Sequence, residues 1–489
     1  MHLSIASIRS LTARLILTVI LTVSFLQAES QYTINSYFGN LEECDTMTRG
    51  IYIVWWDNDF NYGNQVDVLL DSMLSYRTTC LEDLIMADPP NTDDGSYYNV
   101  YIHTPGNPNC VFYPLGWGNG QGTDPNGYPF LTLPNGTFND WLNNAHETFH
   151  IFQYNAKSPG FAYSGDSQWY IEAAANWFAG KQNITAPRAF VEAESLVRVP
   201  HVPLWLSYDN YPYSYPSNWQ RYVHQYAMAL LLFYMTDVAG VPDIAITEGF
   251  FNGTTLLPQA YFYSILGGAT FRGHFLDWAA HMTNDFDFIT PTQAATNLNE
   301  WNTYADPLDD NEFVLELNDE GTDGWFTPAD PVVTNAWSFN TFKLINSMNS
   351  YCTVELSASP TGSYGDDAHF LGKVIVRNSQ SVTTFYDLEM ANAIEGSLTF
   401  ELSSDDTEVF FVIASVPEVF EDSNSEFPLF PYDLRISLSG IGIPEHKPSG
   451  NRSETGRYNL QGQEIHADDR GVQLILFDDG SVEKVFNPE

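Results

Sequence analysis

The chain has 489 residues, and its 44% hydrophobic and 15% aromatic content indicates folded cores and excludes a largely disordered protein. At roughly 100–200 residues per domain this length allows two to four domains. Against 61 Asp and Glu there are only 19 Lys and Arg, a formal net charge of −42 that is spread along the chain. Nucleic acid and anionic membranes are therefore poor partners, because binding phosphate requires Lys and Arg.

The first 30 residues predict a secretory signal peptide. Arg9 and Arg14 precede an apolar segment at 15–26, and Ala28-Glu29-Ser30 offers a small-x-small cleavage site. This segment has 12 residues, whereas a membrane-spanning helix needs about 20. No later stretch is long and apolar enough to span a membrane. We therefore expect a secreted or cell-surface protein with no membrane span in its mature form.

The four cysteines do not form a C-x-x-C pair, which disfavours a thiolate zinc site or a redox motif. In an exported protein we expect one or two disulfides. Three pairings are possible, and the spacing does not select one among Cys44, Cys80, Cys110 and Cys352.

The first part of the chain has an α+β pattern. Hydrophobic runs and alternation predict a strand at 50–56, a helix at 66–76, and strands at 97–103 and 129–133. Thr137 and Asp140 form a T-x-x-D start signal for the next helix, which follows an edge-like strand.

This helix contains His146-Glu147-Thr148-Phe149-His150. Positions four apart lie on one face of an α-helix, so both histidines can direct a nitrogen at one cation. Glu147 lies beside that face, where it can deprotonate a water whose pKa zinc lowers to about 7. The alternative is an ordinary core helix, since an apolar stripe runs beside the histidines.

A catalytic zinc normally has three protein ligands. The extended pattern H-E-x-x-H-x-x-G-x-x-H fails, because Gln153 and Ala156 occupy the positions of its Gly and third His. Glu172 is the preferred third ligand. Its neighbours are apolar, and a buried carboxylate needs a partner. The alternative is a solvated glutamate on a helix surface.

Three other carboxylates are weaker candidates for the third ligand: Asp166, Glu192 and Glu194. Asn176 lies one turn after Glu172 and could accept a hydrogen bond from the second ring nitrogen of a ligand histidine.

The remaining chain changes character near Pro328. Helices are predicted at 168–179, 221–236 and 271–282, with an aromatic loop at 208–215. From 337 to 440, short alternating runs predict a β-sandwich, and a small β-rich segment occupies 457–489.

The pattern His146-Glu147-x-x-His150, followed by Trp169-Tyr170-Ile171-Glu172-Ala173, resembles the gluzincins, which are zinc metallopeptidases. It looks most like secreted zincin-like proteins with H-E-x-x-H-x-x-Q and W-x-x-E-x-x-A-x-W, a pattern that Gln153 and Trp177 fit. The resemblance covers about residues 45–290 and is strongest at 143–178. It implies a Zn²⁺ site and a downstream Tyr or His that stabilises an oxyanion, for which the candidates are Tyr222, His224 and Tyr226.

The C-terminal segment resembles the sorting domain of the Bacteroidetes type IX secretion system. The residues that carry this resemblance are 458–465, 471–477, 479–481 and 484–486. Gln473 occupies a position where an aromatic residue is usual, and the chain lacks a basic end. The alternative is an ordinary small β-hairpin module.

These observations predict an α+β zincin-like catalytic domain, a β-sandwich domain and a small β-rich C-terminal domain. The expected division is a signal peptide at 1–30, the zincin-like domain at 31–330, the sandwich at 331–440, a linker at 441–456 and the sorting-like domain at 457–489.

The expected function is that of a secreted zinc metallopeptidase. His146, His150 and Glu172 would hold Zn²⁺, and Glu147 would act as general base. Its partner would be a protein or peptide substrate that pairs with the strand Phe130–Leu133. The alternative is a non-catalytic surface protein with a zincin fold, whose metal serves structure only. Its β-sandwich and the aromatic loop at 208–215 would then bind a partner such as a cell-surface glycan.

Overall fold

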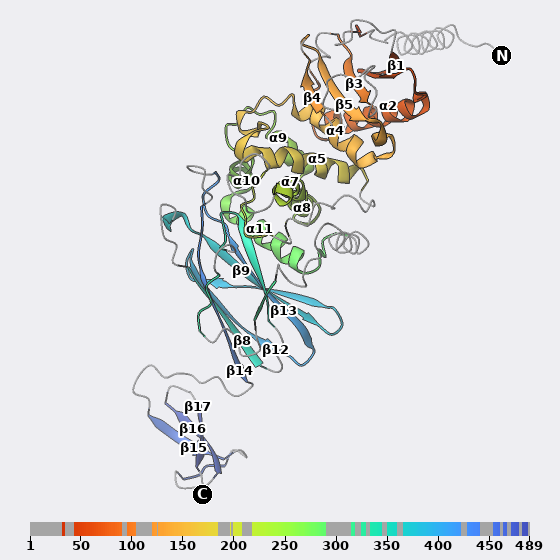
Figure 1. Ribbon diagram of the computed structural model, residues 1–489. Helices are drawn as coiled ribbons and strands as arrows, with labels where there is room; N and C mark the ends of the chain where they lie inside the picture. The colour runs from red at the N-terminus through yellow and green to blue at the C-terminus, as the bar shows by residue number, and fades with distance from the viewer. Residues whose placement is uncertain are drawn as a thin grey trace, which may run out of the picture.

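The structure is a computed structural model (Figure 1). It describes residues 32–34, 44–89, 95–103, 120–124, 126–183, 196, 199–207, 218–289, 314–317, 324–328, 333–344, 350–358, 365–421, 428–440, 453–459, 463–466, 471–478 and 482–487. The predicted signal peptide, the aromatic loop at 208–215 and Cys110 lie outside the described residues.

A five-stranded mixed sheet forms the N-terminal part of the molecule. Its strand order is β1-β2-β3-β5-β4, with parallel pairing in β2-β3-β5 and antiparallel pairing of β1 and β4 at the edges. The strands are β1 (Cys44–Arg49), β2 (Tyr52–Asp57), β3 (Tyr98–His103), β4 (Gly120–Thr123) and β5 (Pro129–Pro134). The three predicted strands are confirmed, whereas β1 and β4 were not predicted.

The position predicted for β5 is wrong. We expected an edge-like strand that could pair with a substrate, but β5 pairs with β3 on one side and with β4 on the other. The physical reason is that β4 occupies the hydrogen-bonding edge of β5. The outer strand on this side of the sheet is therefore β4.

Alternating residues of β2 face opposite sides of this sheet. Val54 and Trp56 join the large hydrophobic core, together with residues of the helices. Ile53 and Trp55 form a small separate cluster with Tyr101 on the other side. The sheet therefore has one face covered by helices, as Figure 1 shows for α2 (Gly63–Thr78) and α4 (Trp141–Gln153).

Helices α2 (Gly63–Thr78) and α4 (Trp141–Gln153) contact each other on the covered face, and α4 packs in turn against α5 (Gln168–Gln182). Small residues allow α5 to approach its other neighbours closely. A Cβ atom added to Gly180 would lie 2.4 Å from the ring of Phe233 in α8 (Ala229–Phe233), so a larger residue would force the ring or the helix to shift.

The predicted start of α4 needs correction. Thr137 belongs to a separate 3-10 helix (Asn135–Asn139), where its hydroxyl donates to the Pro134 carbonyl at 2.8 Å. The N-cap is Asp140, whose carboxylate accepts the Asn143 N–H at 3.2 Å. Helix α4 therefore begins at Trp141, and Thr137 takes no part in capping it.

The predicted helix at 221–236 is interrupted at Met228. It consists of α7 (Asn218–Ala227), α8 (Ala229–Phe233) and a π-helical turn (Tyr234–Val238). Helices α9 (Asp243–Glu248) and α10 (Pro258–Leu266) follow, and the predicted helix at 271–282 is α11 (Gly268–Thr283). Among the described residues, no helix has the length and apolar character needed to cross a membrane.

Two mostly antiparallel sheets form a β-sandwich. One has the order β10-β9-β13-β7-β6 and the other β11-β12-β8-β14. Tyr432 lies between them, with its ring in contact with Phe342 and Phe370. The strands are β6 (Val314–Leu317), β7 (Ser338–Leu344), β8 (Ser350–Ser357), β9 (Phe370–Asn378), β10 (Thr383–Asp387), β11 (Glu389–Met390), β12 (Glu395–Leu402), β13 (Asp406–Ser415) and β14 (Asp433–Gly440).

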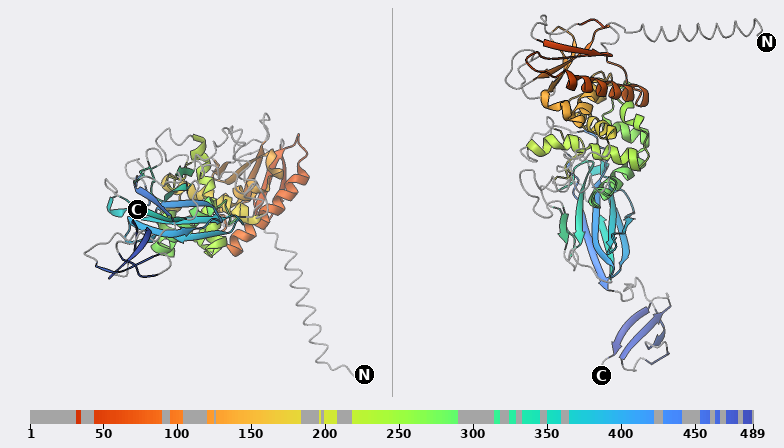
Figure 2. Two further views of the ribbon diagram at one scale, coloured as in Figure 1. Left: turned by 90° about the horizontal axis from the view of Figure 1, so that it is seen from below. Right: turned by 90° about the vertical axis from the view of Figure 1, so that its right-hand side faces the viewer.

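Strand β6 lies before the predicted start of the sandwich at residue 331, yet it pairs in parallel with β7. The sandwich packs closely against the helices, since α11 crosses β9 and β13. Trp337 contacts Phe271 of α11 at a centroid distance of 4.7 Å, and Lys373 forms a 2.6 Å ion pair with Asp277. Figure 2 shows the resulting row of sheet, helices and sandwich.

A separate three-stranded sheet follows, with the order β15-β16-β17. Its strands are β15 (Glu454–Tyr458), β16 (Gly471–Phe477) and β17 (Val482–Asn487). Gln473, which departs from the sorting-domain pattern, is buried and accepts a 2.7 Å hydrogen bond from Arg457. Gln473 and Arg457 therefore form a buried polar pair within this sheet.

The cysteines agree in part with the predicted disulfides. Cys44 is disulfide-bonded, as expected for one disulfide. Cys80 and Cys352 are free and buried, so neither supplies the second disulfide that the sequence allowed.

Candidate metal centre

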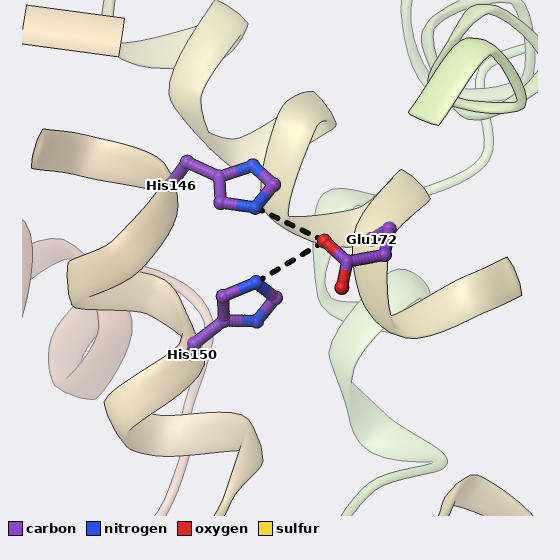
Figure 3. Close-up of side chains that lie close together, drawn as sticks. All are labelled: His146, His150 and Glu172. Atoms are coloured by element: carbon purple, nitrogen blue, oxygen red, sulfur yellow. Dashed lines mark hydrogen bonds and ion pairs between the residues drawn. The ribbon is translucent and has the colours of Figure 1, made fainter. Parts of the chain in front are cut away.

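Helices α4 and α5 bring together His146, His150 and Glu172 (Figure 3). The Glu172 Oε2 atom lies 3.2 Å from His146 Nε2 and 3.3 Å from His150 Nε2. One potential ligand atom from each residue lies within 4.8 Å of the others, and all three residues are buried. Among the described residues, no other group of three His, Cys, Asp or Glu side chains is this close.

Helical periodicity explains the histidine pair. His146 and His150 lie one turn apart on α4, and their rings stand nearly perpendicular with centroids 4.5 Å apart. Stacking of Phe149 on Phe178, at 4.7 Å, holds α4 against α5 beside them. The apolar stripe of α4 thus packs the helix, while the histidine face meets Glu172.

A side-chain amide contacts the second ring nitrogen of each histidine. His146 Nδ1 lies 2.8 Å from Asn176 Oδ1, and His150 Nδ1 lies 2.6 Å from Gln153 Oε1. A backbone carbonyl fixes the orientation of each amide. Asn176 donates to the Tyr226 carbonyl at 3.4 Å, and Gln153 donates to the Ile171 carbonyl at 3.0 Å.

This arrangement determines what the histidines present to Glu172. An amide oxygen only accepts hydrogen bonds, so each Nδ1 carries the proton that it donates. In the neutral form each Nε2 then directs a lone pair at a carboxylate oxygen. Three acceptors that converge in a buried place need a positive charge among them, either a proton or a metal ion. Two imidazole nitrogens and a carboxylate oxygen are common zinc ligands, so the group fits a divalent metal.

The pKa shifts of the metal-free group are consistent with the need for a positive charge among these three side chains. Burial lowers the pKa of His150, but Glu172, Glu147 and Gln153 together outweigh burial and raise that pKa to about 9. Burial raises the pKa of Glu172, but the two histidines outweigh it and hold that pKa well below its ordinary value. Without a metal, a proton shared with Glu172 supplies the positive charge.

Glu147 is buried on α4, next to His146. Its carboxylate is close enough to His150 to contribute to the raised pKa of that histidine. Glu147 is not one of the three residues whose ligand atoms converge. It therefore lies beside the group, as the sequence predicted.

The weaker alternatives for the third ligand do not join this group. Asp166 is described but lies outside it, in a 3-10 helix (Gly165–Ser167) before α5. Glu192 and Glu194 lie outside the described residues.

Of the three candidates for oxyanion stabilisation, Tyr226 has a contact with the group. Its ring centroid lies 5.8 Å from that of His146. His224 is buried, and burial lowers its pKa to about 4. Tyr222 lies in α7, but its side chain is outside the described residues.

The predicted role of Asn176 as hydrogen-bond acceptor is confirmed by its contact with His146. The corresponding role of Gln153 was missed, although its spacing of three residues from His150 places it on the same side of α4.

Residues 61–440 match a family of unknown function, DUF6055, and the chain belongs to this family. No curated protein matches the chain significantly.

Two solved structures show a weak likeness. One is the pre-peptidase C-terminal domain of collagenase from Bacillus anthracis, with 6% identity, a TM-score of 0.16, and coverage of 25% of this chain and 94% of that one. The other is the CBM22-1 xylan-binding domain of Xyn10C from Paenibacillus barcinonensis, with 13% identity, a TM-score of 0.16, and coverage of 25% and 92%. At these TM-scores neither likeness carries an argument about function.

Proposed function

We propose that the protein is a secreted zinc-dependent metallohydrolase, and specifically a peptidase, in which His146, His150 and Glu172 hold the metal. The observation that carries the proposal is the convergence of three buried ligand atoms, two of them on histidines whose second ring nitrogens are held by oriented amides. Such support orients ligand histidines and raises metal affinity. The order of mixed sheet, α4 and α5 supports a zincin-like fold for this part of the chain.

When bound, zinc supplies Lewis-acid polarisation of a carbonyl group and a lowered pKa for water. The chain supplies the proton transfers. Glu147 takes a proton from the attacking water and delivers it to the nitrogen of the leaving amine. Its place beside His150, outside the three ligands, supports this role.

Tyr226 is the best-supported candidate for stabilising the negative charge that develops on the carbonyl oxygen. Its ring lies against His146, and it is partly exposed. A phenolic hydroxyl can donate a hydrogen bond to such an oxygen.

An extended peptide substrate would add to the sheet at β4, because β5 is paired on both sides. Gly122 of β4 lies close to the end of α4. A Cβ atom at this position would be 3.6 Å from the hydroxyl of Tyr154, four residues after His150. The outer strand thus approaches the helix that carries both histidines.

A proteolysis screen of the purified mature protein tests this proposal. Fluorescently labelled casein and a mixed peptide library would be incubated with the zinc-loaded protein, with a chelator, and with zinc restored after chelation. We expect cleavage that the chelator abolishes and zinc restores. Zinc-loaded protein that cleaves nothing would favour the alternative, a non-catalytic surface protein with a structural metal.

A further inference from the structure

Gln168 lies on α5 one turn before Glu172, whose carboxylate belongs to the candidate metal centre. Residues four apart lie on one face of an α-helix, so Gln168, Glu172 and Asn176 share one face of α5. The other two members contact His146. Gln168 therefore continues the row by one turn.

The direction of the helices places Gln168 beyond His150. Along α4, His146 contacts Asn176, and His150 contacts Glu172. Residue numbers therefore increase along α4 in the direction in which they decrease along α5, so the two helices are antiparallel. The next position along this row is that of Gln168.

The carboxamide of Gln168 is incompletely satisfied. Only 2% of the residue is exposed, and its Oε1 has no hydrogen-bond partner among the described residues. A buried acceptor in this state loses the hydrogen bonds that it would make with water. Native proteins pair nearly all such groups, so an unpaired one indicates a ligand or a bound water.

A second buried glutamine shows the ordinary arrangement. Gln259 in α10 accepts from Trp169 Nε1 at 3.1 Å and donates to the carbonyls of Asp166 at 3.3 Å and Phe420 at 2.6 Å. Its amide ties α5 to the sandwich. Burial alone therefore does not leave a glutamine unpaired in this protein.

We infer that Gln168 is a substrate-binding residue whose Oε1 accepts a hydrogen bond from a backbone N–H of a peptide at the metal centre. This inference rests on the proposed function, because it assigns Gln168 to the same site. An acceptor one turn from Glu172 fixes the position of the peptide along the site. This hydrogen bond raises the affinity for substrates that carry a backbone N–H. It does not change the affinity for small molecules that bind only the metal.

Two zinc-binding probes distinguish binding to the metal from binding to a peptide backbone N–H. Acetohydroxamate binds a metal without a peptide, whereas a dipeptide hydroxamate adds backbone N–H groups. Their affinities for zinc-loaded wild type, Gln168→Met and Gln259→Met would be measured by calorimetry, together with zinc content and Tm. Methionine keeps the length of glutamine and removes the amide.

For Gln168→Met we expect unchanged zinc content and acetohydroxamate affinity, an unchanged or higher Tm, and about tenfold weaker binding of the dipeptide hydroxamate. The control Gln259→Met should lower Tm by several degrees, because paired groups lose their partner, and should keep the affinity ratio of the two probes. An unchanged ratio in Gln168→Met, or a fall in Tm like that of the control, would overturn the inference alone. Failure of both probes to bind the wild type would overturn the proposed function, and the inference with it.

Discussion

His150 and Gln153 form the shortest hydrogen bond at the candidate metal centre, with 2.6 Å between Nδ1 and Oε1. The same amide donates to the carbonyl of Ile171, the residue before Glu172. Gln153 thus connects His150 on α4 to helix α5. It fixes the ring of His150 and the spacing of the two helices at once.

Replacing Gln153 should weaken metal binding. Gln153→Met leaves the His150 ring free to rotate and to carry its proton on either nitrogen, so zinc affinity should fall about 10- to 100-fold. Competition with a chromophoric chelator measures this. Gln153→Glu, which keeps an acceptor for His150 but loses the donor to Ile171, should retain more affinity than Gln153→Met. Equal affinities in wild type and Gln153→Met would show that the amide does not orient the ligand.

The second prediction concerns metal content. The mature protein should bind about one zinc per chain, and Glu172→Ala should lose most of it, because the remaining histidines supply two ligands. Elemental analysis after dialysis is the measurement. Asp166→Ala, which removes a carboxylate outside the group, is the control and should retain zinc. Full zinc content in Glu172→Ala together with an empty site in His146→Ala would exclude Glu172 as the third ligand.

The third prediction is a pH dependence of the metal-free protein. The pKa of His150 rises from 6.5 to about 9 on folding, so its contribution to stability is complete below pH 6.5 and is lost as the pH rises through 9. The pKa of Glu172 falls on folding from 4.5, so its contribution is present above pH 4.5 and is lost at lower pH. Together they stabilise the metal-free protein most between pH 4.5 and 6.5.

Thermal unfolding of chelator-treated protein across this range tests that prediction. The Tm difference between wild type and His150→Gln should shrink as the pH rises from 6.5 to 9. A difference that stays constant over that interval would contradict the assigned interaction of His150 with Glu172.

The fourth prediction concerns export. If the resemblance to a sorting domain holds, residues 457–489 should be absent from the mature secreted protein or covalently modified. Removal of this segment would cut through β15 (Glu454–Tyr458) and take away β16 and β17. Intact mass of the protein from the medium of its native host decides this. A C-terminus that ends unmodified at Glu489 would exclude the sorting role.

The sequence predicted the residues of the site better than their surroundings. His146 with His150, and Glu172 with Asn176, each follow helical periodicity, which depends on local spacing. The apolar neighbours of Glu172 indicated that its carboxylate is buried and needs a partner. The role of Gln153 depends on the carbonyl of Ile171, and only the packed helices bring those two residues together.

The strands missed at the sheet edges have the same cause. In β4 the residues Gly120-Gln121-Gly122-Thr123 have the composition of a loop, and they form a strand because β5 lies beside them. The polar residues of β1 likewise form a strand through pairing with β2. Pairing between distant segments is not encoded in local composition, which is why β5 was expected at an edge.

The most direct test of the proposed peptidase is the turnover of Glu147→Gln. Glutamine keeps the size of the side chain but cannot accept a proton from water. Zinc content and Tm should remain near the wild-type values, while chelator-sensitive cleavage of labelled casein should fall at least about 100-fold. Full chelator-sensitive activity in Glu147→Gln would contradict the account, even if the protein proved to be a peptidase.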